Sequence, residues 1–376
     1  MCLSICRCLL AFARAVRAFF GIRWREGAYA LVSLPMGLRV SVMVACAITD
    51  FLLSFEREGV VATAYVDNVR FTGGDEEAVT AATLEFVRSC REVGAQLDSM
   101  PRTREEAGIL IEREGDFLGV HFDYKGKRLR LTQKTIQKIQ MINPATTCEK
   151  SITFKQFTVI MGLFNFAARV TRFPLYKVYH LLRRHREEAT IEALFPLKVW
   201  GEREVSLTTK ELEDLRYMQA AFLTNEEVDF SLLPGTDAVI FSDACEEGWG
   251  GVLLMNGGIR VKAGRWTDEE RLGGKMQASA ISEPKGLIRV WKSFEDEAFT
   301  HALVLLDHEP LVWGWESGRP HSYHYNKAVA ALAEGKKLAT VEFIPGIHNP
   351  ADYPSRGREI PEEVREGILR GNWKDS

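Results

Sequence analysis

Apolar and polar positions in the first part of the chain follow a pattern that predicts short strands and one long helix. Residues 60–66 and 69–71 are two short apolar runs that flank Asp67-Asn68. Because Asp and Asn favour tight turns, this segment predicts a β-hairpin with the two polar residues at its tip. Apolar residues then recur at helical spacing over residues 76–93, which predicts a helix.

The middle of the chain has a helical pattern, and the last third alternates between strands and helices. Residues 155–172 are the clearest amphipathic stretch, and residues 231–237 have the composition of a linker. Three strands in sequence, then alternating helices and strands, predict a mixed sheet covered by helices. We expect strands at residues 238–242, 250–255, 258–262, 302–306 and 340–344, and helices from about Glu283 and at 325–334.

These patterns divide the 376 residues into four parts, and the fold class they indicate combines α/β and α+β architecture. The length suggests about two or three domains. The expected parts are residues 1–145, 146–232 and 233–360, followed by a C-terminal tail at 361–376.

Composition bears on the cellular compartment more than on the partners. A formal net charge of −3 neither indicates nor excludes nucleic acid, because binding depends on where the cations lie. The seven cysteines have no metal-ligand or disulfide spacing, so we expect thiols in a reducing compartment. Arginines interrupt the apolar N-terminus, and residues 40–48 are too short to cross a bilayer. We therefore expect an intracellular protein, cytoplasmic or nuclear, without membrane partners.

Four acidic residues lie at informative places in the last third of the chain. Asp243 and Asp307 each end an apolar strand, Glu283 opens a helix next to Pro284, and Asp352 begins the final short helix. Each acid alone is better explained as a solvated surface residue in a chain with 51 acidic residues. Together at one sheet edge, they would repel each other unless divalent cations neutralised them. Two cations about 3.5–4 Å apart, held by carboxylates, would give a site that cleaves phosphodiesters.

The segments around these acids resemble the ribonuclease H domains of retroelements. Phe241-Ser-Asp243-Ala-Cys-Glu-Glu-Gly-Trp249-Gly-Gly is similar to their first strand and hairpin, and Ile281-Ser-Glu283 to their second motif. Leu305-Leu-Asp307-His308 matches the third, although the family usually has Asn in place of His308. The segment 344–356 is close to the terminal motif. The resemblance implies cleavage of the RNA strand of RNA–DNA hybrids by two Mg²⁺ or Mn²⁺ ions. The implied catalytic and metal-binding residues are Asp243, Glu283, Asp307 and Asp352.

Two histidines lie beside these motifs, and two interpretations of each remain open. His308 and His348 are placed to assist product release or to orient water near the metals. The alternative is a surface or hydrogen-bonded structural histidine, which is the commoner role.

The N-terminal part resembles the palm of reverse transcriptases. The motifs are Leu34-Pro35-Met-Gly37, Tyr65-Val-Asp67-Asn68 and the primer-grip-like Phe117-Leu-Gly119. Residues 151–169 resemble the thumb or connection segment of retroelements that encode a tyrosine recombinase, the DIRS-like group. The implied fold is a truncated palm without fingers, a helical thumb or connection, and an RNase H-like mixed five-stranded sheet with flanking helices.

The polymerase-like site departs from the family pattern at two metal-binding positions. Asn68 stands in place of a second aspartate at the hairpin tip, and Cys2 stands where the first aspartate is expected. Neither side chain replaces a carboxylate well as a magnesium ligand. We therefore expect polymerase activity to be lost. The residues of this remnant are Cys2, Pro35, Gly37, Tyr65, Asp67 and Asn68.

A basic stretch is the best candidate for contact with nucleic-acid phosphates. It lies between and after two expected strands, residues 116–124 and 128–131, and a solvated face is the alternative explanation. The segment 183–186 is a second candidate for phosphate contact, with less support. The basic stretch comprises Lys125, Lys127, Arg128, Arg130, Lys134 and Lys138.

Three hypotheses about function follow from the sequence. The first is a retroelement-derived enzyme that binds RNA, DNA and their hybrid and cleaves the RNA strand. The second is a reverse transcriptase that remains active despite Asn68. The third is an inactive element remnant or a nucleic-acid-binding module. The order Asp, Glu, Asp, Asp argues against an integrase, and the sequence leaves the oligomeric state open.

Overall fold

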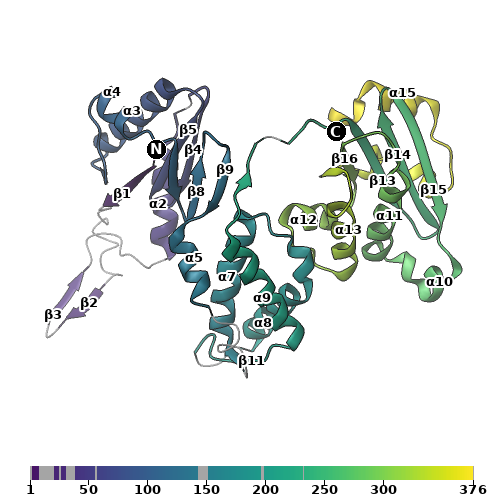
Figure 1. Ribbon diagram of the computed structural model, residues 1–376, viewed down its shortest axis with the longest axis horizontal. Coiled ribbons are helices and arrows are strands. Elements are labelled where there is room, and N and C mark those ends of the chain that lie inside the picture. The colour runs from purple at the N-terminus through teal and green to yellow at the C-terminus, as the bar shows by residue number, and fades with distance from the viewer. Residues whose placement is uncertain are drawn as a thin grey trace. The chain divides into compact units, whose positions relative to one another are not determined.

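The computed structural model describes residues 2–7, 21–24, 27–30, 39–55, 57–142, 151–195, 199–231 and 233–375 (Figure 1). The chain divides into two compact units, Met1–Arg128 and Leu129–Ser376. The finer boundaries expected at residues 146, 233 and 361 stay predictions. Among the described residues, no helix is long and apolar enough to cross a membrane.

The first unit contains a four-stranded sheet of order β4-β5-β1-β6. Strands β4 (Val60–Tyr65) and β5 (Asn68–Gly73) form the predicted hairpin, and helix α3 (Glu76–Glu92) is the predicted helix. The side chain of Asp75 caps α3 by accepting a hydrogen bond from the backbone of Glu77. Its other elements are β1 (Cys2–Arg7), β2 (Gly21–Trp24), β3 (Gly27–Ala30), α2 (Arg39–Leu52), β6 (Gln96–Leu97) and α4 (Arg104–Ile109).

One expectation for this unit was wrong. Residues 116–124, expected as one strand, form a second hairpin from β7 (Glu114–Phe117) and β8 (Val120–Asp123). The turn between them holds Leu118 at a φ of 51° and Gly119 at a φ of 87°. An apolar leucine gives no turn signal, so only the glycine marked this bend in the sequence.

The second unit begins with a helical region that has its own core. Helices α7 (Phe154–Val170), α8 (Tyr179–Leu194) and α9 (Thr209–Thr224) bury a cluster that includes Phe157, Phe164 and Phe222. The predicted amphipathic helix over residues 155–172 corresponds to α7. The remaining elements of this region are β9 (Arg128–Leu131), α5 (Gln133–Gln140), β10 (Ile152–Thr153), η1 (Leu175–Val178), β11 (Glu204–Val205) and β12 (Val228–Asp229).

The rest of the second unit is the predicted mixed five-stranded sheet, which is confirmed. Its strand order is β15-β14-β13-β16-β17. The β15–β14 and β14–β13 pairs are antiparallel, and the β13–β16 and β16–β17 pairs are parallel. The parallel and antiparallel parts of the sheet therefore meet at β13 (Figure 1). The strands are β13 (Ala238–Ala244), β14 (Gly248–Met255), β15 (Gly258–Arg265), β16 (His301–Leu306) and β17 (Leu338–Phe343).

Both faces of this sheet are covered, because side chains alternate between the faces along each strand. Ile240 packs in a cluster with residues of α11 (Ser279–Ser293), α12 (Glu309–Ser317) and α13 (Tyr323–Ala333). Phe241 faces the other way, in a cluster that includes Ile368 of α15 (Glu362–Arg370). The expected tail therefore contains a helix that contributes to the core. The short elements are α10 (Asp268–Arg271), η2 (Leu272–Gln277), η3 (Gly346–His348), α14 (Asp352–Ser355) and η4 (Asn372–Asp375).

The position of Glu283 within its helix differs from the prediction. Helix α11 starts at Ser279, so Glu283 lies in the second turn and Pro284 lies inside the helix. Proline lacks an N–H, and this removes one intrahelical hydrogen bond. The sequence signal of a proline at a helix start was therefore misleading here.

Candidate active site

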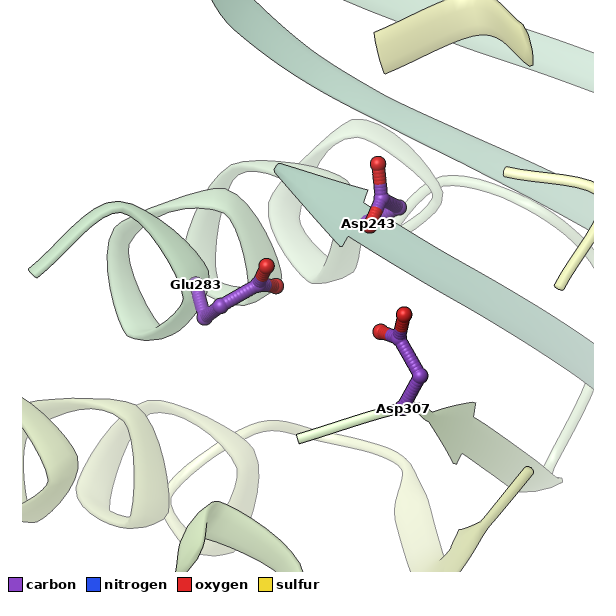
Figure 2. Close-up of side chains that lie close together, drawn as sticks. All are labelled: Asp243, Glu283 and Asp307. Atoms are coloured by element: carbon purple, nitrogen blue, oxygen red, sulfur yellow. The ribbon is translucent and has the colours of Figure 1, made fainter. Parts of the chain in front are cut away.

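Three carboxylates from three different elements meet at one end of the sheet. Asp243 is the last but one residue of β13, Asp307 directly follows β16, and Glu283 projects from α11. Strands β13 and β16 are parallel neighbours, which brings their ends to the same edge. One oxygen of each carboxylate lies within 4.8 Å of one from each of the others. Figure 2 shows the three side chains pointing toward one another.

Burial and mutual repulsion disfavour the charged forms of Asp243 and Glu283. Asp243 is only 5% exposed, and its Oδ2 has no hydrogen-bond partner among the described residues. Burial, together with the charges of Asp307 and Asp352, raises the pKa of Asp243. Burial and the charges of Asp243 and Asp307 raise the pKa of Glu283 to about 9. Such a set of hard oxygen donors fits a divalent cation, which would remove the repulsion.

Asn349 connects the terminal motif to this cluster. Its Nδ2 donates to the backbone oxygen of Ser242 at 3.0 Å and lies 3.4 Å from Oδ1 of Asp307. Its own Oδ1 accepts a hydrogen bond from the backbone of Ala351. The side chain of Asn349 is 3% exposed, so a buried amide orients the partly exposed Asp307. Sequence reasoning placed Asn349 only within a motif and missed this positioning role.

Asp352, the fourth predicted ligand, has different partners. It begins α14, as predicted, but its Oδ1 accepts from Nε of Arg356 at 2.6 Å and its Oδ2 from Nη2 of Arg358 at 2.9 Å. It does not belong to the group of three carboxylates within 4.8 Å. Sequence reasoning missed both arginines, although their spacing of four and six residues from the acid was a signal.

Close packing of α14 on the sheet determines where Asp352 lies. A Cβ at Gly250 of β14 would lie 2.3 Å from the backbone nitrogen of Ser355 and 2.9 Å from the backbone oxygen of Ala351. Only glycine therefore allows α14 to approach this strand so closely. The glycine at position 250 of the first motif is therefore explained by the close packing of α14 on β14.

The two candidate histidines lie in different environments. His308 is half-buried against the ring of Tyr325, and burial lowers its pKa despite the neighbouring Asp307. His348 is exposed. Both of the roles considered for these residues stay hypotheses.

The polymerase-like residues lie at the β4–β5 hairpin of the first unit. Asn68 donates from Nδ2 to Oδ1 of Asp67 at 3.3 Å, and Tyr65 is exposed. The backbone of β1 pairs with β5, with Cys2 opposite Arg70. The side chain of Cys2 lies outside the described residues. Pro35 and Gly37 also lie outside them.

The basic stretch is on the surface. Lys125 and Lys127 belong to the segment between β8 and β9, where Lys127 has a φ of 52°. Arg130 has its Nε 3.9 Å from a carboxylate oxygen of Glu227. All of the predicted phosphate-binding residues are exposed: Lys125, Lys127, Arg128, Arg130 and Lys134, together with Lys138.

Comparisons with known proteins find structural but no sequence relatives. No protein-family model and no curated protein matches the chain. A foamy viral protease–reverse transcriptase in complex with double-stranded DNA has a TM-score of 0.44 at 15% identity, over 91% of this chain and 56% of that one. A foamy viral protease–reverse transcriptase in complex with an RNA/DNA hybrid has a TM-score of 0.43 at 16% identity, over 91% of this chain and 43% of that one. The chain thus spans about half of these proteins.

A shorter structure is similar to part of the chain. The N-terminal RNase H domain of a Mycobacterium tuberculosis protein, solved as a fusion with maltose-binding protein, has a TM-score of 0.24 at 19% identity. The match covers 37% of this chain and 99% of that one. The fold of residues 238–343 is defined by the order of the five strands, β15-β14-β13-β16-β17.

Proposed function

We propose that this protein is a ribonuclease H of retroelement origin, related to the DIRS-like group, that hydrolyses the RNA strand of RNA–DNA hybrids. The observation that carries the proposal is the convergence of Asp243, Glu283 and Asp307 within 4.8 Å at the edge of an RNase H-like sheet. Carboxylates at this separation need a counter-charge, and hard divalent cations prefer oxygen ligands of this kind.

Asp243, Glu283, Asp307 and Asp352 are the proposed ligands of two Mg²⁺ or Mn²⁺ ions. When bound, such ions activate a water molecule and stabilise the charge on the phosphodiester. The unpartnered Oδ2 of Asp243 is available as a ligand. Glu283, with a pKa of about 9, holds a proton at neutral pH in the cation-free protein. A cation must displace this proton, so its affinity rises with pH.

The other residues of the site orient these carboxylates. Asn349 holds Asp307 through the contact to its Oδ1. Asp352 must exchange at least one of its two arginine contacts to act as a ligand. The proposal therefore assigns Arg356 and Arg358 the role of counter-charges for Asp352 in the cation-free protein.

The proposed substrate is a hybrid duplex, which proteins recognise through its shape, its backbone and the 2′-hydroxyls of the RNA strand. The exposed cations of the basic stretch are proposed to contact its phosphates. These are Lys125, Lys127, Arg128, Arg130 and Lys134.

Cleavage of a labelled hybrid by the full chain tests the proposal. We expect Mg²⁺- or Mn²⁺-dependent cutting of the RNA strand by the wild type. The Asp243→Asn variant should bind the hybrid without cutting it, because it lacks one ligand charge in the centre of the cluster. Cleavage that persists in this variant, or a well-folded wild type that does not cut, contradicts the assignment.

We further propose that RNA-directed DNA polymerase activity has been lost. Asp67 is the single carboxylate at the β4–β5 tip, and its Oδ1 accepts a hydrogen bond from Asn68. Two metal ions need more negative charge than one carboxylate supplies. Primer extension on an RNA template is the measurement, and DNA synthesis by the wild type would overturn this part.

A further inference from the structure

Three arginines from different elements of the second unit lie near enough for their charges to act on one another. Arg169 lies near the end of α7, Arg186 in α8, and Arg319 directly after Gly318, the C-cap of α12. Nη2 of Arg186 donates to the backbone oxygen of Pro320 at 3.3 Å, so α8 contacts the segment that carries Arg319. Burial and the positive charges of Arg169 and Arg186 lower the pKa of Arg319.

This group lacks acidic partners, unlike the arginines around it. Arg183 pairs with Glu187 at 2.7 Å, and Arg184 pairs with Glu188 at 2.7 Å. Within the described part of the chain, by contrast, no carboxylate lies within 4.0 Å of a guanidinium nitrogen of Arg169, Arg186 or Arg319. Nε of Arg319 is buried and has no hydrogen-bond partner among the described residues.

The neighbouring His185 does not supply the missing negative charge. Its ring packs edge-on against Phe157, with centroids 5.2 Å apart. Burial and the charges of Arg319 and Arg186 lower its pKa, so it is neutral near pH 7. Glu187, whose charge does act on Arg186, is bound to Arg183 instead.

Arg186 and Arg319 are half-buried, and Arg169 is exposed beside them. Half-buried like charges raise the free energy of the folded chain unless a ligand brings the opposite charge. The planar guanidinium has its donors in a fork that matches the oxygens of a phosphate. Three such forks from α7, α8 and the segment after α12 favour a single phosphate group over a carboxylate. A carboxylate would neutralise less of the charge.

We propose that Arg169, Arg186 and Arg319 bind a backbone phosphate of the nucleic acid on which the protein acts. This rests on the proposed function for the identity of the ligand. Helix α12 begins two residues after Asp307 and ends two residues before Arg319. With nine residues at ~1.5 Å each, it separates the two sites by on the order of 14 Å, or ~4 base pairs of a duplex at ~3.4 Å. A duplex bound at the carboxylates would have backbone phosphates at a comparable separation from the cleaved bond.

Hybrid binding by the full chain tests this site with cleavage blocked by Asp243→Asn. In that background, Arg319→Gln should weaken binding of a labelled hybrid roughly tenfold, as expected for one lost charge-assisted hydrogen bond. The slope of log K against log salt should fall by about one. Arg216→Gln changes an exposed arginine of α9 in the same unit and is the matched control. Equal affinities and slopes for the two variants would overturn the proposal.

Thermal unfolding separates a binding role from a structural one. Arg319→Gln removes an uncompensated charge, so the Tm of the free protein should stay constant or rise. Inorganic phosphate should raise the Tm of the wild type and not that of Arg319→Gln. A lowered Tm in the variant together with unchanged hybrid binding would show a packing role and overturn the proposal.

Two further outcomes are distinguishable. Stabilisation by inorganic phosphate without any effect of Arg319→Gln on hybrid binding would indicate a site for free phosphate, which overturns the nucleic-acid assignment. Failure of the wild type to cleave hybrid would contradict the proposed function alone. The binding comparison is made with cleavage blocked, so it still decides whether these arginines hold a phosphate of the backbone.

Discussion

At the scale of single residues, the chemistry of the candidate site depends on how far each carboxylate is from water and from its neighbours. Asp243 and Glu283 have raised pKa values mainly because they are buried, and the adjacent acids add to the effect. Asp352 is more exposed and lies between two guanidiniums. The same functional group therefore meets a buried environment at Asp243 and Glu283 and an environment rich in cations at Asp352.

Glu283 should make the cation-free protein less stable at high pH. Its pKa is raised from 4.5 to about 9, so between these values the folded state binds more protons than the unfolded state. This stabilising contribution is fully present below pH ~4.5 and is lost as the pH rises through about 9. We expect the Tm in EDTA to fall between pH 5 and 9, and Glu283→Gln to flatten the fall.

The raised pKa of Asp243 acts in the same direction. The Tm of Glu283→Gln should therefore still fall with pH, but less steeply than the Tm of the wild type. Glu269→Gln changes an exposed acid of α10 and should leave the pH profile as in the wild type. Identical profiles for Glu283→Gln and the wild type would show that Glu283 titrates normally in the folded protein.

Arg356→Gln should strengthen cation binding by the free protein. The change removes the guanidinium that lies 2.6 Å from Oδ1 of Asp352. An exposed ion pair of this kind contributes up to about 1 kcal/mol, so the affinity for Mn²⁺ should rise roughly two- to fivefold. Isothermal titration calorimetry with Mn²⁺ measures this change. Arg370→Gln breaks an equally spaced pair with Glu366 and should have no effect. Equal affinities in all three proteins would contradict the proposed role of Arg356.

At the scale of helices and strands, the site depends on close packing that only small residues permit. A Cβ at Gly286 of α11 would lie 2.6 Å from Cβ of Ala244, at the end of β13. Because Gly286 has no Cβ, the helix that carries Glu283 can approach the strand that carries Asp243. Gly250 has the same function for α14 on β14. Gly250 and Gly286 therefore allow the close packing that the site requires, without taking part in its chemistry.

Gly250→Ala should destabilise the protein and impair its site. The new methyl group would meet the backbone of α14, which cannot move aside as a flexible side chain can. Overpacking of this kind reduces the free energy of unfolding by about 1–3 kcal/mol, and cleavage should fall because Asp352 is displaced. Urea unfolding and hybrid cleavage are the measurements.

Gly162→Ala is the matched control for this prediction. Gly162 lies inside α7 with no other atom within 4 Å of the added Cβ. Alanine is the better helix former, so this variant should be about 0.5–1 kcal/mol more stable. Equal stability of the two variants would refute the packing argument for Gly250.

At the scale of the whole molecule, the hydrophobic cores are separate. The cluster around Phe86 contains only residues of Met1–Arg128, whereas the clusters of the helical region and of the five-stranded sheet contain only residues of Leu129–Ser376. Loss of a core side chain in one unit is therefore expected to leave the apolar core of the other intact.

Phe86→Ala should affect the first unit alone. Phe86 and Phe294 are both fully buried, in the cores of the first and the second unit respectively. Each change to alanine should reduce the stability of its own unit by about 3–5 kcal/mol. In hydrogen-exchange mass spectrometry, Phe86→Ala should speed exchange in α3 and leave β13 unchanged, with cleavage retained. Phe294→Ala should do the reverse and lose cleavage. Faster exchange in β13 of the Phe86 variant would show that the units unfold together.

The sequence by itself determined the elements whose periodicity is strong. The β4–β5 hairpin, α3 and the five strands of the mixed sheet were predicted because alternation and helical spacing are local properties. Three strands followed by alternating helices and strands also predicted a mixed sheet, whereas the order β15-β14-β13-β16-β17 comes from the tertiary structure. The sequence also located Asp307 at the end of a strand and Asp352 at the start of a short helix, whereas Glu283 lies in the second turn of α11.

Only the tertiary structure decided how those residues meet. Local signals misplaced the start of α11, because Pro284 is tolerated inside the helix. They also did not predict the turn at Leu118, because leucine is rare at a positive φ. The contact of Asn349 with Ser242 joins residues 107 positions apart. The arginine cluster likewise draws on three separate elements. Burial, pKa shifts and missing partners are properties of assembled neighbours, and no local pattern encodes them.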